Sequence, residues 1–168
     1  MNKTNLATIA RHAVAAYPHE CCGLLIREGR KRVYVPCRNT ASTPSEHFRL
    51  APEDYAAAEE RGEILAVVHS HPDCPATPSE ADRVACEASG LPWHIVEVRT
   101  DDDGQVRTGE WASCTPNGYQ APLIGRAFAH GVHDCLSIIL DYYRRELGIE
   151  LGDYPVSYTH LRAHETVL

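Results

Sequence analysis

Residues 64–71 constrain the fold most strongly, because a continuous apolar run leads directly into two histidines. The run at residues 64–68 is aliphatic and rich in β-branched side chains, which predicts a buried central strand. His69 and His71 follow, and side chains two positions apart on a strand lie on one face. Prolines at 72, 75 and 78 then predict a loop over residues 69–78. The sequence therefore predicts a strand end that presents two imidazoles to one side.

A helix is predicted directly after this loop. Thr77 would be its N-cap and Glu80 its third residue, which together form a capping box. Ser79 and Asp82 are three positions apart and would share a face of the first turns. The proline-rich loop allows this helix to fold back over the strand end, so both side chains are candidates for the same site as the histidines.

The remaining pattern alternates helices and strands over residues 1–113, which predicts one α/β domain. Thr4 or Asn5 would cap the first helix, and Pro36 would end the second strand. The expected elements are a helix at 4–16, strands at 21–26 and 32–35, a helix at 52–61, and two strands at 93–99 and 105–111 joined by a turn at 101–104.

Composition excludes several classes of protein. The chain has 16 Lys and Arg against 23 Asp and Glu, so it lacks the basic stripe that nucleic-acid binding requires. The aliphatic run at 64–68 is too short to span a membrane. The N-terminal residues contain no apolar segment followed by a cleavage site, so no secretory signal is expected. Seven cysteines without a CxxC pair indicate free thiols in a reducing compartment.

Two imidazoles and one carboxylate are a suitable three-ligand set for Zn²⁺ with an open fourth position. His69, His71 and Asp82 are therefore candidate metal ligands. Glu20 precedes the first strand and could act as a general base if that strand lies beside the histidine strand. Ser79 could donate a hydrogen bond to a developing oxyanion.

Each of these residues alone is commonly found at the surface or at the start of a helix, without a catalytic role. Their joint occurrence in this order has no such explanation. The ordered set of Glu20, the segment His-Ser-His-Pro at 69–72 and the segment Pro-Ser-Glu-Ala-Asp at 78–82 resembles the JAMM (MPN-plus) metallopeptidase motif at every defining position. The resemblance extends over about residues 6–111. It implies a mixed sheet flanked by helices, Zn²⁺ held by the two histidines and Asp82, Glu20 as acid and base, and hydrolysis of peptide or isopeptide bonds.

A second candidate site lies near the end of the chain. Residues 134–147 have a strong helical pattern with Asp134 as N-cap, which places Cys135 in the first turn. The helix dipole favours a thiolate there, but the residues alone favour a buried structural cysteine, because free cysteines commonly lie in the core. The apolar face of this helix is expected to be exposed, because the sheet that would cover it is not encoded within residues 125–155.

Residues 118–155 resemble the start of an NlpC-type cysteine peptidase, which implies that Cys135 is a nucleophile and that its partner histidine lies downstream. A JAMM domain followed by such a segment resembles the tail-tip assembly proteins of lambdoid phages. Residues 114–124 would be a linker, and 125–155 the start of a C-terminal α+β domain that is truncated. Residues 156–168 resemble a translated sequencing adaptor and are expected to be non-native, so His160 and His164 receive no role.

Together, these resemblances imply a zinc-dependent peptidase from a phage tail, expected in the host cytoplasm during assembly and in the virion tail. Its partners would be a peptide or isopeptide substrate, peptidoglycan peptides for the second domain, and other tail-tip proteins. The alternative is a non-catalytic assembly module stabilised by zinc. A structural zinc would have a fourth protein ligand, such as Cys74 or His94, in place of water.

Overall fold

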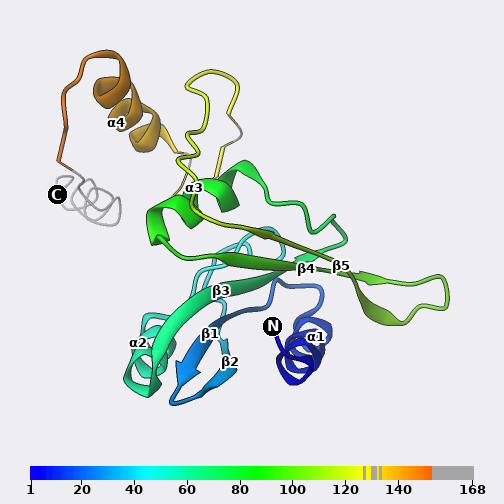
Figure 1. Cartoon of the computed structure of the whole chain (residues 1–168). Helices are drawn as coiled ribbons and strands as arrows, with labels where there is room; N and C mark the ends of the chain where they lie inside the picture. Colours follow the sequence, from blue (N-terminus) through cyan, green and yellow to red (C-terminus); the bar gives the residue numbers. More distant parts are fainter. Residues whose placement is uncertain (127, 130–131, 133, 153–168) are drawn as a thin grey trace, which may run out of the picture. The chain divides into compact units, whose positions relative to one another are not determined.

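The computed structural model describes residues 1–126, 128–129, 132 and 134–152. Its contacts divide the chain into two compact units, Met1–Gly118 and Tyr119–Leu168. The first unit contains a five-stranded sheet with strand order β2-β1-β3-β4-β5 (Figure 1). The strands are β1 (Cys22–Glu28), β2 (Lys31–Cys37), β3 (Glu63–Pro72), β4 (Trp93–Thr100) and β5 (Val106–Cys114), and the helices are α1 (Lys3–Ala16), α2 (Pro52–Arg61) and α3 (Glu80–Ser89).

The sheet is mixed, as expected from the sequence. Strands β3 and β4 are parallel, and every other neighbouring pair is antiparallel. The parallel pair needs a long connection, which α3 provides. Strand β3 is therefore the centre of the sheet, hydrogen-bonded on both sides.

Helices cover both faces of this sheet, because β3 is apolar on both sides. Val67 packs into a core cluster with Ala58 of α2 and Cys86 of α3. Val68, one position further, packs into a second cluster with Ile9 of α1. Since strand side chains alternate between faces, the two histidines that follow Val67 at intervals of two lie on the face that α2 and α3 cover.

Strand β3 is longer than predicted. Residues 69–72 were expected in a loop, but they continue the strand to Pro72 and pair with β4. Pro72 is tolerated because it is the last residue of the strand, where one missing N–H costs little. Pro36 likewise lies inside β2 and does not end it, since β2 is an edge strand.

The caps of two helices also differ from expectation. Ser79 rather than Thr77 caps α3, and Asp82 rather than Glu80 completes the capping box. The reason is geometric: an oxygen of Asp82 accepts the backbone N–H of Ser79 at 2.7 Å, and the Ser79 hydroxyl accepts the N–H of Asp82 at 3.1 Å. Asn2 caps α1 in place of the predicted Thr4 or Asn5. Helix α2 begins and ends at the predicted residues.

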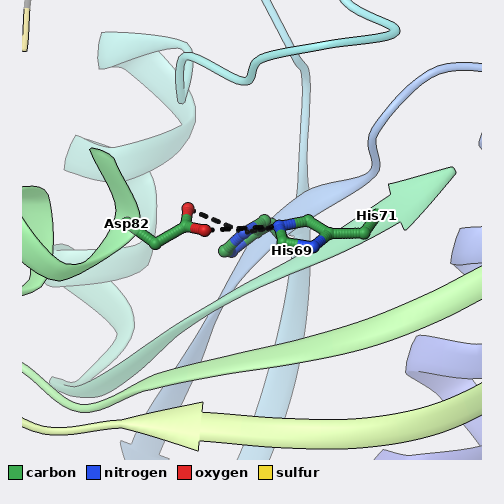
Figure 2. Close-up of side chains that lie close together, drawn as sticks. All are labelled: His69, His71 and Asp82. Carbon is green, nitrogen blue, oxygen red and sulfur yellow. Dashed lines mark hydrogen bonds and ion pairs between the residues drawn. The ribbon is translucent and has the colours of Figure 1, made fainter. Parts of the chain in front are cut away.

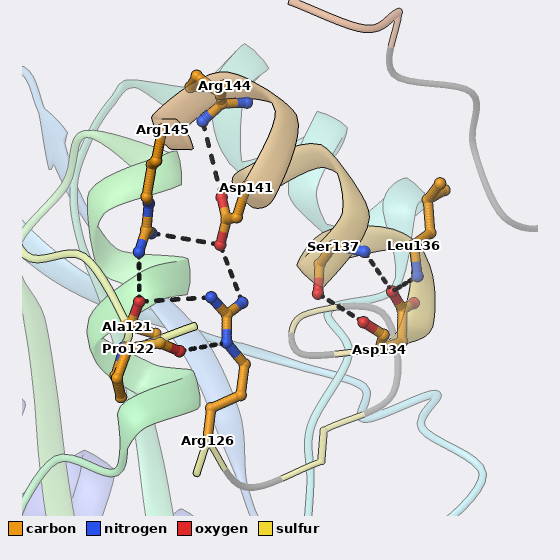
Figure 3. Close-up of polar contacts among 9 residues, drawn as sticks. All are labelled: Ala121, Pro122, Arg126, Asp134, Leu136, Ser137, Asp141, Arg144 and Arg145. Carbon is orange, nitrogen blue, oxygen red and sulfur yellow. Dashed lines mark hydrogen bonds and ion pairs between the residues drawn. The ribbon is translucent and has the colours of Figure 1, made fainter. Parts of the chain in front are cut away.

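Helix α4 (Cys135–Glu146) is the one helix assigned among the described residues of the second unit, with Asp134 as its N-cap as predicted. Asp141 on this helix forms ion pairs with Arg126 at 2.9 Å and Arg145 at 3.2 Å (Figure 3). No residue of α4 is buried, in agreement with the expected exposure of its apolar face. The predicted non-native segment, residues 156–168, lies outside the described residues.

Among the residues that the structure describes, none of the helices has the length and apolar character needed to cross a bilayer.

The stability of the first unit should depend on the cluster under α2 and α3. Leu24 is fully buried there. Leu24→Ala is expected to lower the free energy of unfolding by about 2–5 kcal/mol, because it leaves a cavity in a packed core. Ile124→Ala, at a side chain that is 91% exposed, should change it by less than about 0.5 kcal/mol. Denaturant unfolding measures both, and equal losses would contradict the assigned core.

Candidate metal centre

Strand β3 delivers both histidines to one face of the sheet. His69 is completely buried and His71 is largely buried. Figure 2 shows both imidazoles directed toward the carboxylate of Asp82 on α3. Helix α3 follows the loop after β3 and returns over the same face of the sheet. Asp82 therefore meets His69 and His71, although it lies 13 and 11 positions after them in the sequence.

The three side chains bring one potential ligand atom each to a common centre. The two Nε2 atoms of His69 and His71 are 3.1 Å apart. His69 Nε2 lies 3.1 Å from Asp82 Oδ1, and His71 Nε2 lies 3.3 Å from Asp82 Oδ2. Among the described residues, these three form the one group of His, Cys, Asp and Glu side chains close enough together to hold a metal ion.

The three side chains differ in their protonation: burial lowers the pKa of His71, but its hydrogen bonds with Asp82 and the Pro75 carbonyl raise it overall, whereas His69 and Asp82 favour their deprotonated forms. His71 Nδ1 lies 2.8 Å from the carbonyl oxygen of Pro75, which only accepts, so this nitrogen carries a proton and a neutral His71 keeps its lone pair on Nε2. Burial lowers the pKa of His69 and favours its neutral form. Burial opposes ionisation of Asp82, but hydrogen bonds with His69 and His71 hold its pKa well below the usual range. Lone pairs that face one another at this distance require a proton or a cation between them, and two imidazoles with a carboxylate suit Zn²⁺.

Ser79 holds Asp82 in place. Its hydroxyl lies 2.7 Å from Asp82 Oδ2, and its backbone N–H donates to the same oxygen at 2.7 Å. The residues that cap α3 are therefore the residues that orient the carboxylate. To donate the predicted hydrogen bond to an oxyanion, the Ser79 hydroxyl would first have to break its hydrogen bond to Asp82.

Two aromatic rings enclose His69. Phe48 stacks on its imidazole with ring centroids 4.5 Å apart, and Trp93 meets it edge-on at 5.5 Å. The sequence analysis did not identify Phe48 as part of the site, because the polar segment around it shows no periodicity. Its one distinguishing feature in the sequence is that the chain has only two phenylalanines.

Glu20 lies beside His71 because the antiparallel pairing of β1 and β3 continues past the end of the ladder. Cys22 pairs with His69, and Cys21 accepts the N–H of Ser70 while donating its own N–H to the Ser70 hydroxyl. The next residue back, Glu20, is therefore opposite His71. Glu20 is 7% exposed, and burial raises the pKa of its carboxyl to about 8, with His71 acting against the rise and Asp82 adding to it.

Neither of the alternative fourth ligands belongs to the group of three metal-binding side chains in the described part of the chain. His94 pairs with Val68 in the β3–β4 ladder, so it faces the α1 side of the sheet. Cys74 is exposed. Among the described residues, the group that could hold a metal ion therefore consists of three side chains.

The thiol of Cys135 is exposed at the first residue of α4. The carboxylate of Asp134 caps this turn by accepting the N–H groups of Leu136 and Ser137 (Figure 3). The nearby His130 and His133 lie outside the described residues, as do His160 and His164.

The chain is similar in sequence to two phage proteins. The curated relatives include tail tip assembly protein K of Escherichia phage N15, which is 46% identical over 158 residues, 94% of this chain and 61% of that protein. Tail tip assembly protein K of Escherichia phage lambda is 40% identical over 105 residues, 62% of this chain and 46% of that protein. The chain thus spans about half to three fifths of these two relatives.

A desampylase from Haloferax volcanii is 27% identical over 127 residues, 66% of this chain and 88% of that protein.

The family model described as prokaryotic homologs of the JAB domain matches residues 3–112, about two thirds of the chain. This range contains β1 to β4, all but the last two residues of β5, and the three side chains of the candidate metal centre. The chain therefore belongs to the prokaryotic JAB-domain family.

Proposed function

We propose that the first unit hydrolyses a peptide or isopeptide bond with Zn²⁺ held by His69, His71 and Asp82. The observation that carries this proposal is the meeting of three potential ligand atoms, with no fourth candidate in the described part of the chain, beside a buried carboxyl group. A bound Zn²⁺ supplies an electrophile that polarises a carbonyl and lowers the pKa of water. The relationship to a desampylase supports a hydrolytic reaction.

Glu20 is the proton carrier in this proposal. Its carboxylate removes a proton from the attacking water, and its carboxylic acid returns that proton to the leaving amine. Burial suits this role, because it brings the acidic and basic forms of Glu20 closer in energy near neutral pH. A cation in the neighbouring centre lowers the pKa of Glu20 from this raised value, which favours the base form.

Ser79 has two roles in the proposal. Its hydroxyl and backbone N–H orient the Asp82 carboxylate in the resting site. When the tetrahedral oxyanion develops, the hydroxyl turns and donates its hydrogen bond to that oxygen.

The proposed setting is the assembly of a phage tail, in the host cytoplasm and then in the virion tail. The two relatives named tail tip assembly protein K support this setting and support other tail-tip proteins as partners. The same relatives favour the second candidate function, a non-catalytic assembly module in which zinc only stabilises the fold.

For the second unit, we propose that residues 125–155 begin an NlpC-type cysteine peptidase with Cys135 as nucleophile, acting on cell-wall peptides. The exposed thiol at a helix N-terminus supports this assignment. The full-length gene tests it: the continuation must encode a histidine whose substitution abolishes hydrolysis of peptidoglycan peptides. If the continuation encodes no such histidine, Cys135 is not a nucleophile.

Replacement of Glu20 separates the catalytic function from the stabilising one. Glu20→Gln should lower kcat at least about a hundredfold on fluorogenic peptides and lysine isopeptides, because the proton carrier is lost. Zinc content, measured by atomic emission, should stay equal to that of the wild type. Glu60→Gln, at an exposed position on α2, is the matched control and should keep full activity, as should Cys135→Ser. Zinc binding without hydrolysis in the wild type would favour the assembly module.

Asp82 tests the assignment of the metal ligands. Asp82→Asn removes the anionic ligand but keeps the side-chain shape, so zinc affinity should fall at least about tenfold to a hundredfold, and activity should fall with it. Asp102→Asn, in the exposed turn between β4 and β5, is the control. Isothermal titration of chelator-treated protein with Zn²⁺ provides the measurement. Unchanged affinity in Asp82→Asn would remove Asp82 from the ligand set.

A further inference from the structure

The loop at residues 38–50, between β2 and α2, is organised around the side chain of Asn39. The backbone bridge between Asn39 and Leu50 closes the loop, and the N–H of Thr40 donates to the carbonyl oxygen of Arg49 at 2.8 Å. Arg38, the residue before this bridge, forms ion pairs with Glu53 and Asp54 in the first turn of α2. These contacts fix the two ends of the loop to the rest of the domain.

The amide of Asn39 has one possible orientation. Its oxygen accepts the backbone N–H groups of Ala41 and Arg49, both at 3.0 Å. Its nitrogen faces carbonyl oxygens only, those of Glu20 at 3.1 Å, His47 at 3.0 Å and Pro44 at 3.5 Å. Donors on one side and acceptors on the other exclude the flipped amide and exclude a carboxylate.

This side chain joins the loop to the backbone of Glu20. Glu20 precedes β1, so its own N–H and carbonyl have no place in the β-ladder. The loop satisfies both groups: the N–H of Glu20 donates to Pro44 at 2.7 Å, and its carbonyl accepts from Asn39. The backbone of Glu20 is held from both sides by one segment.

The same loop also reaches the metal centre at a second point. Phe48 stacks on His69 and contacts Trp93 with ring centroids 5.4 Å apart. The loop at 38–50 therefore holds the backbone of Glu20 and also covers the imidazole of His69. The side chain of Asn39 ties this loop together, because it bonds to Ala41 near the start of the loop and to His47 and Arg49 near its end.

We infer that Asn39 is a positioning residue, which sets the place of the Glu20 carboxylate through the Glu20 backbone. This inference rests on the proposed function, because it assigns Asn39 to the reaction in which Glu20 carries the proton. Asn39 touches neither the metal ligands nor the reacting atoms. Its effect is on the geometry of proton transfer, where displacements of about 1 Å change rates by up to about a hundredfold.

The test compares Asn39 with a second bridging asparagine. Asn5 on α1 also joins distant segments, since its nitrogen donates to Arg32 at 2.9 Å and its oxygen accepts from Tyr34 at 3.3 Å. It lies on the α1 side of the sheet, opposite the metal centre. Asn5→Ala therefore removes a comparable structural bridge without touching the loop at 38–50.

Three measurements are made on the zinc-loaded full chain. In Asn39→Ala and Asn39→Asp, kcat should fall about tenfold to a hundredfold while KM and zinc content change less than about threefold. In Asn5→Ala, the unfolding midpoint should fall while kcat stays within about twofold. Amide hydrogen exchange of Glu20 should become at least about tenfold faster in the Asn39 variants and not in Asn5→Ala, with Ser70 unchanged in all three.

The outcomes separate this inference from the proposed function. If Asn5→Ala and the Asn39 variants lose kcat in proportion to stability, Asn39 is structural only and the inference fails. Unchanged exchange at Glu20 in the Asn39 variants would also overturn it. If the wild type hydrolyses none of the substrates, the proposed function fails and Asn39 has no reaction to serve, even where exchange at Glu20 shows that it positions the backbone.

Discussion

The meeting of two imidazole nitrogens and one carboxylate at 3.1–3.3 Å is the interaction on which the account of this domain depends. Neutral imidazole nitrogens and carboxylate oxygens carry lone pairs, and lone pairs do not gather in a buried place without a proton or a cation between them. Much of the surrounding structure makes this gathering possible. Strand β3 is extended beyond its apolar run, and α3 returns over the face of the sheet on which both histidines lie.

The fold uses a single set of contacts for stability and for the site. The capping box that begins α3 is also the device that aims Asp82, and the pairing of β1 with β3 that builds the core also places Glu20 beside His71. A change in the capping box would therefore alter both the stability of α3 and the position of Asp82. A change in the pairing of β1 with β3 would alter both the stability of the sheet and the position of Glu20. The candidate site is thus built on regular elements and on the residues that flank them, Glu20 and Ser79, together with the loop at 38–50.

Much of this arrangement could be predicted from sequence, and the limits have physical reasons. The continuous apolar run predicted that β3 is a buried central strand, spacing placed His69 and His71 on one side of it, and the mixed sheet was implied by the family resemblance. The exact cap of α3 was predicted wrongly, since the sequence offers two capping boxes, Thr77 with Glu80 and Ser79 with Asp82, and the helix uses the second. Asn39 and Phe48 could not be found either. Their partners are backbone groups and a ring far away in the sequence, which leave no local pattern.

X-ray absorption at the zinc edge of the metal-loaded chain tests the central claim most directly. The account predicts a first shell of nitrogen and oxygen atoms only at about 2.0–2.1 Å, with multiple scattering from two imidazoles. A sulfur atom at about 2.3 Å would contradict it, because a cysteine would then complete a structural site. A spectrum without imidazole scattering would show that the two histidines of β3 do not bind the metal.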